Sequence, residues 1–282
     1  VKTQFTDLHL ARERAKNIKW KAISTLDTQL EDFEAAITRR GAKVIWAENA
    51  AEALEAVKKI CEEKNCKTLV KSKSMVTEEI HLNEFLEKNG IESVETDLGE
   101  YIQQLDGEPP YHILTPAMHK SKEDVAKLFS HKLGTDPKAT PEQLTLVARK
   151  VLREKYVQAE VGVTGANFII SDIGGIAITE NEGNGRLSCS MPKTHIVIAG
   201  IEKVIPSMQD LALFWPLLST FGTGQRVTVY NTIITGPRQS NEKDGPEEMY
   251  VILLDNGRTN ILANEKMRES LYCIRCGACL NA

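Results

Sequence analysis

The feature that most constrains the fold is a regular alternation of short apolar runs and amphipathic helices across residues 42–161. The runs predicted as strands, rich in apolar and β-branched side chains, are 42–47, 68–71, 91–95 and 111–115. The segments between and after them that are predicted as helices are 50–63, 77–89, 121–133 and 141–161. This alternation predicts an α/β fold in which helices cover both faces of a parallel sheet.

The flanking regions extend this pattern. Apolar residues recur near a 3.6-residue period between Ile18 and Ile37, which predicts an N-terminal helical extension over residues 1–40. The second half is richer in strands, predicted at 168–170, 176–179, 195–199, 227–234 and 250–254, with a helix at 208–218. Because no linker interrupts residues 41–260, we expect one domain there, followed by a helix at 260–271 and a separate terminal region, 261–282.

Composition narrows the class of protein. The 282 residues are 41% hydrophobic and 26% charged, with a net charge of −4, which is typical of a globular chain with a sizeable core. Charges of both signs are interspersed and no basic stripe is present, so we expect no nucleic-acid partner. No apolar run is long enough for a transmembrane helix and no leader is visible, so we expect a cytoplasmic protein.

Three cysteines near the end of the chain follow a metal-ligand spacing. Cys273, Cys276 and Cys279 form C-x2-C-x2-C, the beginning of the pattern by which bacterial ferredoxins hold 4Fe–4S clusters. A zinc half-site is the alternative, although the second cysteine pair that zinc usually requires is not present. The sequence stops one position before the fourth cysteine of the ferredoxin pattern. We therefore expect this chain to be a truncation of a longer iron–sulfur protein. We expect the truncated chain by itself to bind no cluster stably.

A polar, glycine-dense stretch is the first candidate binding site. Six glycines lie in residues 162–186, together with several small or amide side chains. Glycine lets the backbone approach a ligand, Arg186 offers a guanidinium to an anion, and Glu182 offers a base or nucleophile. The same composition is also typical of tight turns between strands.

The second candidate is the segment Lys71–Met75, between a predicted strand and the following helix. Ligands of open α/β sheets bind at the carboxyl ends of strands, and serines and lysines before a helix suit an anion. A solvated loop with a serine that caps the helix explains these residues equally well.

Several separated motifs together resemble one family. Residues 161–175, 181–186 and 192–195 resemble the LUD-domain proteins, and more narrowly the lactate-utilisation protein B family. Further motifs of this resemblance lie at 71–75, 224–225, 236–238 and 273–279. The resemblance covers nearly the whole chain, and the motifs occur in the family's order.

The resemblance implies a fold and a function. It implies a Rossmann-like three-layer α/β/α sheet, similar to the superfamily of CoA transferases and sugar-phosphate isomerases. It also implies the iron–sulfur subunit of a complex that oxidises L-lactate to pyruvate, with two 4Fe–4S clusters in a C-terminal ferredoxin-like region. The other subunits of that complex and a small anionic ligand are the implied partners. The alternative is that the LUD domain is itself an enzyme, acting as a transferase or isomerase on a small anion.

The resemblance also assigns residues to a pocket in residues 41–260. Glu182 is the candidate catalytic residue. The candidate ligand-binding residues are Lys71, Ser72, Ser74, Thr164, Gly165, Asn167, Asp172, Gly174, Asn184 and Arg186. The candidate metal ligands are Cys273, Cys276 and Cys279.

Overall fold

A six-stranded sheet forms the centre of the computed structural model, which describes residues 1–280. The strands lie in the order β1-β10-β7-β4-β2-β3, and every neighbouring pair is parallel. Their bounds are β1 (Lys43–Ala47), β2 (Thr68–Lys71), β3 (Glu92–Glu95), β4 (Val161–Thr164), β7 (Thr194–Gly200) and β10 (Glu248–Leu254). The predicted α/β fold with a parallel sheet is confirmed.

Strands β7 and β10, both in the interior of the sheet, are buried on both faces. Alternate residues of β10, such as Ile252 and Leu253, enter two different core clusters. Ile198 and Val197 of β7 divide in the same way. Because side chains alternate across a strand, a continuous apolar run is what a sheet covered on both sides requires.

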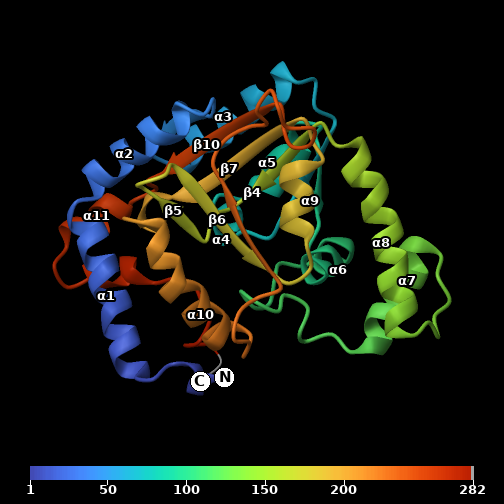
Figure 1. Ribbon diagram of the computed structural model, residues 1–282. Helices are drawn as coiled ribbons and strands as arrows, with labels where there is room; N and C mark the ends of the chain where they lie inside the picture. The colour runs from blue at the N-terminus through green and yellow to red at the C-terminus, as the bar shows by residue number, and fades with distance from the viewer. Residues whose placement is uncertain (281–282) are drawn as a thin grey trace.

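Helices cover both faces and make three layers (Figure 1). One face is packed by α3 (Ala50–Glu63), α4 (Met75–Glu79) and α5 (Leu82–Lys88). The other is packed by α2 (Leu26–Thr38), α6 (Leu98–Asp106), α7 (Lys122–Leu133) and α8 (Pro141–Gln158). This arrangement confirms the predicted three-layer α/β/α architecture.

A second, four-stranded sheet was not expected from the sequence. Its order is β8-β5-β6-β9, with bounds β5 (Phe168–Ile170), β6 (Gly175–Glu180), β8 (Val204–Ile205) and β9 (Tyr230–Ile234). Apolar side chains of this sheet pack on α1 (Leu8–Ser24) and α10 (Leu211–Gly222). Figure 1 shows both helices on the same side of the molecule as this sheet.

Shorter helices complete the described chain. They are α9 (Asn184–Ser190), α11 (Arg258–Ala263) and the 3-10 helices Lys2–Gln4, Ile201–Lys203, Met208–Asp210 and Arg268–Tyr272. The helix expected at 260–271 is therefore two short pieces. The domain boundaries at residues 40 and 260 stay predictions, and residues 281–282 of the expected terminal region lie outside the described residues.

Several predicted helices end or break earlier than expected. The helix expected over the first forty residues divides into α1 and α2 at Thr25. The helix expected at 77–89 divides at His81, whose φ of 53° is incompatible with a continuous right-handed helix. The helix expected to reach residue 161 ends at Gln158, because Val161 begins a strand that bonds to β2 and β7.

The strand expected at 111–115 is wrong. This segment forms a loop in which the Tyr111 N–H donates to the Pro116 carbonyl at 3.0 Å, and Ile113 and Leu114 pack inward from it. Helices α6 and α9 are not among the helices predicted from the sequence. Both begin beside the pocket described below.

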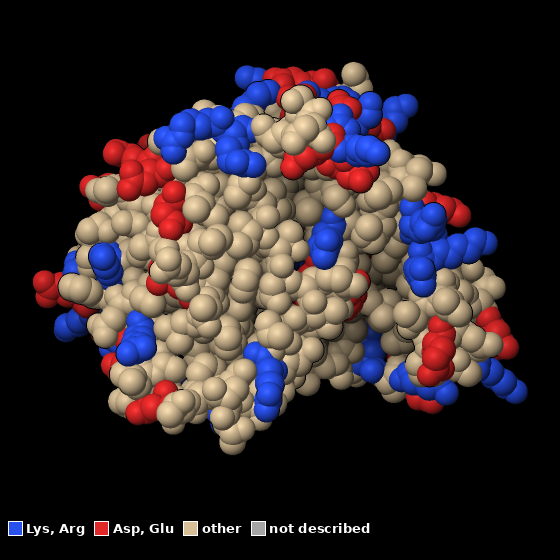
Figure 2. Space-filling view, viewed as in Figure 1, with Lys and Arg blue, Asp and Glu red and all other residues tan. Residues whose placement is uncertain are grey.

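In Figure 2, charged side chains of both signs lie mainly around the top and outer edges of the face shown, and the middle of this face is mostly uncharged. Within residues 1–280, no helix has both the length and the apolar character that crossing a membrane requires.

Candidate functional site

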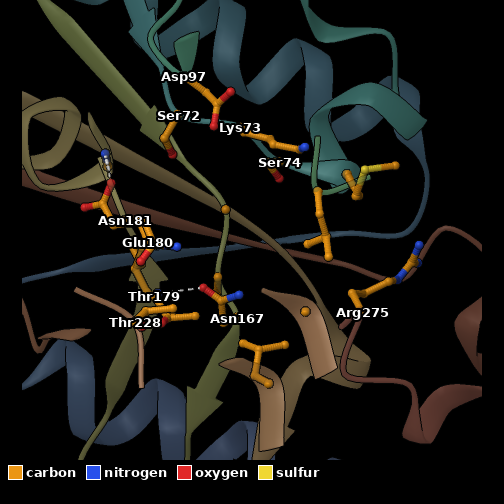
Figure 3. A pocket seen from close by; sticks show the side chains of 18 of the residues that line it. Ser72, Lys73, Ser74, Asp97, Asn167, Thr179, Glu180, Asn181, Thr228 and Arg275 are labelled. Carbon is orange, nitrogen blue, oxygen red and sulfur yellow. Dashed lines mark hydrogen bonds between the residues drawn. The ribbon is translucent and has the colours of Figure 1, made fainter. Parts of the chain in front are cut away.

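A pocket of about 280 Å³ lies at the carboxyl ends of the parallel strands. Loops that follow β2, β3 and β4 form one part of its wall, as expected for neighbouring parallel strands whose ends share one edge of a sheet. The end of β6 and the start of α9 form another part. Figure 3 shows Asp97, Lys73 and Ser74 on one side, Glu180 and Asn181 on a second, and Arg275 across from them.

Six of the residues predicted from the sequence line this pocket: Ser72, Ser74, Gly165, Asn167, Glu182 and Asn184. A Cβ atom on Gly165 would lie 2.5 Å from the Ser74 Oγ, so this approach of two strand-end loops requires glycine. The Asn167 Oδ1 accepts from the Thr179 N–H at 2.8 Å (Figure 3). That bond orients the Asn167 amide and leaves its NH₂ group available to a ligand.

Five predicted residues do not line the pocket: Lys71, Thr164, Asp172, Gly174 and Arg186. The Lys71 ammonium is fully buried and contacts the Glu95 carboxylate at 2.6 Å. The Thr164 hydroxyl is bonded to the buried His195 Nε2 at 2.8 Å. Both side chains are therefore committed to contacts inside the fold.

The remaining three lie elsewhere. Asp172 accepts from the Met208 N–H at 3.1 Å. Gly174 has a φ of 61° and packs so closely on α2 that a Cβ would lie 2.4 Å from the Ile37 nitrogen. The Arg186 guanidinium lies over the Tyr230 ring, 5.4 Å from its centroid. These contacts give Asp172, Gly174 and Arg186 structural roles that do not involve a ligand.

Carboxylates on the pocket wall are held by backbone amides. Glu180 accepts from the N–H groups of Gly185 and Arg186, at 2.7 and 2.8 Å, at the start of α9. Glu182 accepts from the Leu98 N–H at 3.0 Å, at the start of α6. Helix N-termini favour negative charge, so these bonds fix both acids in place.

Burial changes the proton affinity of these acids. Glu182 is exposed as a residue, but desolvation of its carboxyl group raises the pKa of Glu182 to about 7, with the nearby charge of Asp97 acting in the same direction and the Leu98 N–H opposing it. Burial also raises the pKa of Glu180, against the two amide bonds. A carboxyl group whose pKa lies near 7 can both give and take a proton at neutral pH.

Three cationic residues of the pocket were not among the predicted site residues: Lys73, Lys203 and Arg275. The Lys73 ammonium is 3.7 Å from the Glu100 carboxylate, and burial lowers the pKa of Lys73. Lys203 ends the 3-10 helix after β7, and Arg275 lies between two of the candidate metal ligands. Only Lys73 and Arg275 stood within recognised motifs, and Lys203 carried no local signal.

The segment that carries the cysteines packs beside the pocket. A Cβ on Gly277 would lie 2.8 Å from Leu114 Cδ1, and Gly277 has a φ of 73°. Cys276 is half-buried against the core cluster of α1 and α10, while Cys273 and Cys279 are exposed. The loop from 109 to 120 and the cysteine segment therefore close one side of the pocket together.

The donor chemistry of this segment suits an iron–sulfur cluster, but its sulfurs are not gathered. The Arg275 N–H donates to the Cys273 Sγ at 3.4 Å, the kind of bond that stabilises a ligating thiolate. Within residues 1–280, however, no group of three or more histidine, cysteine or acidic side chains is placed to hold a metal ion. Ligation by Cys273, Cys276 and Cys279 stays a prediction.

A pH dependence of stability follows from Glu100, which lies buried beside the pocket. Burial raises the pKa of Glu100 to about 8, and the charge of Glu95 adds to the effect. The folded protein thus keeps a proton that the unfolded chain releases above its ordinary pKa of 4.5. This stabilisation is complete below pH 4.5 and is lost as the pH rises through 8, by about 1.4 kcal/mol per pH unit inside the window.

Urea unfolding from pH 5 to 8 measures this slope. Glu100→Gln should flatten it, and Glu182 should leave a residual slope of the same sign because its pKa is also raised. Both proteins retain the four other charged groups that act on Glu100, which are Lys71, Lys73, Glu78 and Glu95. Superimposable slopes for the two proteins would show that Glu100 is ionised at neutral pH.

The structure defines an α/β domain with a pocket at the carboxyl ends of a parallel sheet and a segment with three cysteines at the rim of that pocket. The LUD domain matches residues 30–254, and the chain belongs to the LUD domain family. The resemblance drawn from the sequence motifs is thereby confirmed.

Relatives with a high sequence identity carry two kinds of name. Lactate utilization protein B of Bacillus velezensis is 46% identical over 96% of this chain and 57% of its own length. Its namesake in Bacillus subtilis is 45% identical over 96% of this chain and 56% of its own length. Uncharacterized electron transport protein YkgF of Escherichia coli is 42% identical, with 96% and 57% covered. The chain thus spans a little over half the length of these relatives.

Among solved structures, a DUF162 family protein from Deinococcus radiodurans is similar, with a TM-score of 0.47 and 14% identity. The match covers 82% of this chain and 98% of that chain.

Proposed function

We propose that this chain is the LUD-domain part of an iron–sulfur electron-transfer protein that serves the oxidation of L-lactate to pyruvate. Its pocket binds a small anion. The names of the relatives, which refer to lactate utilization and to electron transport, support this proposal. The observation that carries it is that Arg275, between Cys273 and Cys276, is part of the pocket wall.

In this proposal the cysteine segment supplies cluster ligands. Cys273, Cys276 and Cys279 would provide three thiolates, and the Arg275 N–H would stabilise the first of them. A 4Fe–4S cluster transfers one electron at a time, and the protein sets its position and potential. The resemblance implies two such clusters in the complete protein.

The adjacency of pocket and cysteine segment fits this role. Gly222 of α10 lies against the Cys276 carbonyl, and Leu114 of the pocket lies against Gly277. A ligand in the pocket would therefore sit on the same structural unit as the first cluster ligands. Other subunits of a lactate-oxidising complex would act as electron donor and acceptor, in the cytoplasm.

Metal analysis tests the electron-transfer role. The product of the complete gene, reconstituted anaerobically with iron and sulfide, should bind iron and acid-labile sulfide and show broad visible absorbance that dithionite bleaches. Cys276→Ala should reduce the iron content, whereas Cys189→Ala, which alters a buried thiol on α9, should leave it unchanged. A complete gene product that binds zinc, or no metal, would refute the proposal.

A second function is favoured by Glu182 alone. Its carboxyl group lines the pocket and has a pKa raised to about 7 by desolvation, which suits a general base at neutral pH, and its ionised form would be the nucleophile. The LUD domain would then act as a transferase or isomerase on a small anionic substrate. Glu182→Gln preserves the bond from Leu98 and removes the titrating group. Turnover of acyl-CoA or sugar-phosphate substrates that is lost in this variant would support the enzyme, and no turnover by the unaltered chain would exclude it for those substrates.

A further inference from the structure

Lys203 is a buried cation without a partner. Its side chain is 6% exposed, yet its ammonium makes no hydrogen bond or ion pair within residues 1–280. The neighbouring Glu202 carboxylate is instead held by Arg258, and Lys19 donates to the Glu202 and Val204 carbonyls. The Lys203 ammonium is not among the fully buried polar groups that lack a partner, so the side chain is buried along its length while its charged end reaches the pocket. A charge in such a partly enclosed place is poorly hydrated, and an anionic ligand would stabilise it.

A second cation lies at the rim of the same pocket. Arg275 is exposed and has no ion pair within the described chain; in Figure 3 it lies across the pocket from Glu180 and Asn181, with its guanidinium directed outward. Burial lowers the pKa of Lys203 to about 8, and the nearby charge of Arg275 lowers it further against the attraction of Glu202. The charges of Lys203 and Arg275 are therefore close enough to repel each other.

The acidic residues of the pocket do not neutralise this pair. Glu180 and Glu182 direct their carboxylates to the amides at the starts of α9 and α6. Asp97 accepts from two amides of α6 in the same way. The pocket thus has an acidic side, whose carboxylates accept from backbone N–H groups, and a cationic side whose two charges form no ion pair within residues 1–280. Glu202, which attracts Lys203, is itself paired with Arg258.

The other lining residues indicate the class of anion. Ile113, Leu114, Ile178 and Leu218 give the pocket an apolar part, while the Asn167 amide adds a neutral hydrogen-bond donor. A carboxylate suits one lysine and one arginine, because a guanidinium binds its two oxygens together and an ammonium adds a point charge. The apolar part of the pocket suits a ligand with a short aliphatic chain.

We propose that Lys203 and Arg275 together bind the carboxylate of a small 2-hydroxy or 2-oxo monocarboxylate. The Asn167 NH₂ group then donates a hydrogen bond to the oxygen on the second carbon of this ligand. This proposal rests on the anion-binding role proposed for the pocket and names the residues and the ligand class. Because Arg275 belongs to the cysteine segment, the site is complete only when that segment is packed on the LUD domain.

Isothermal titration of this chain with L-lactate and with pyruvate tests the proposal, with propane-1,2-diol as the uncharged analogue and inorganic phosphate as a different anion. We expect binding of the monocarboxylates and none of the diol. Lys203→Met and Arg275→Gln should each weaken binding about tenfold or more. Lys150→Gln, which removes an exposed charge on α8, should leave the affinity within about twofold.

A stability readout separates a binding role of Lys203 from a structural one. Without ligand, Lys203→Met should raise the melting temperature, because it removes an unpaired buried charge. A lowered melting temperature with unchanged affinity would show a structural role and overturn the proposal. So would tighter binding of phosphate than of monocarboxylates, or no binding of either. None of these results bears on the iron and sulfide content, which tests the electron-transfer role separately.

Discussion

Replacing Lys71 with methionine is expected to lower the free energy of unfolding by about 3–5 kcal/mol. The Lys71 ammonium is fully buried and lies 2.6 Å from a Glu95 oxygen and 3.0 Å from a Glu78 oxygen. It also donates to the Thr77 hydroxyl at 2.9 Å. Burial alone would lower the pKa of Lys71, but the two carboxylates outweigh it and raise that pKa. Removing the lysine leaves a buried carboxylate without its cation, which is the costly way to break an ion pair.

Chemical denaturation at neutral pH measures this loss. Lys71→Met combined with Glu95→Gln should recover part of the stability, because the uncompensated carboxylate is then absent. Lys203→Met is the matched comparison, since it also removes a buried lysine but should act in the opposite direction. A change of less than about 1 kcal/mol for Lys71→Met would show that this ion pair is not a structural element of the fold.

Gly162→Ala is expected to destabilise the protein by about 3 kcal/mol or more, at the upper end of overpacking effects. Gly162 lies in β4, bonded on both sides to neighbouring strands, where a Cβ would lie 1.8 Å from the Ser188 carbonyl oxygen of α9. Because β4 is bonded to both β2 and β7, it cannot move away from the clash, so α9 must shift. Because α9 begins with Asn184 and Gly185 of the pocket wall, the substitution should also weaken ligand binding.

Gly222→Ala is the control for this substitution. Gly222 is helical, and the nearest atom to its added Cβ is at the ordinary distance of 3.4 Å, so the expected change in stability is near zero or slightly favourable. Thermal unfolding of the two variants measures the difference. Equal stability of Gly162→Ala and the unaltered protein would mean that α9 is not packed on β4 as described.

The parallel sheet could be predicted from the sequence because its strands are covered on both faces. Runs such as residues 250–254 are continuously apolar and therefore recognisable without their partners. The sequence pattern does not predict strand β4, because Val161 falls in the helix expected at 141–161 and Gly162 begins the glycine-dense stretch considered as a binding site or as tight turns. Its glycine is required by the carbonyl of Ser188, which lies 26 residues away along the chain and cannot be inferred from local sequence.

The candidate site was likewise predictable only where local sequence determines it. The strand-end rule placed the segment Lys71–Met75 at a pocket, and Ser72 and Ser74 do line it. Within that segment, however, the predicted Lys71 is the last residue of β2 and enters the core, whereas Lys73 reaches the pocket. Lys203 could not be predicted, because its burial and its lack of a partner depend on α1, α11 and the cysteine segment, which meet only in the folded chain.

The most direct test of the proposed function is the spectrum of the reconstituted product of the complete gene while L-lactate is supplied with the other lactate-utilisation subunits. Bleaching of the cluster absorbance by L-lactate, abolished by Cys276→Ala and retained in Cys189→Ala, is the expected result. A cluster-loaded protein whose absorbance L-lactate leaves unchanged in the complete complex, while dithionite bleaches it, would contradict a role in lactate oxidation.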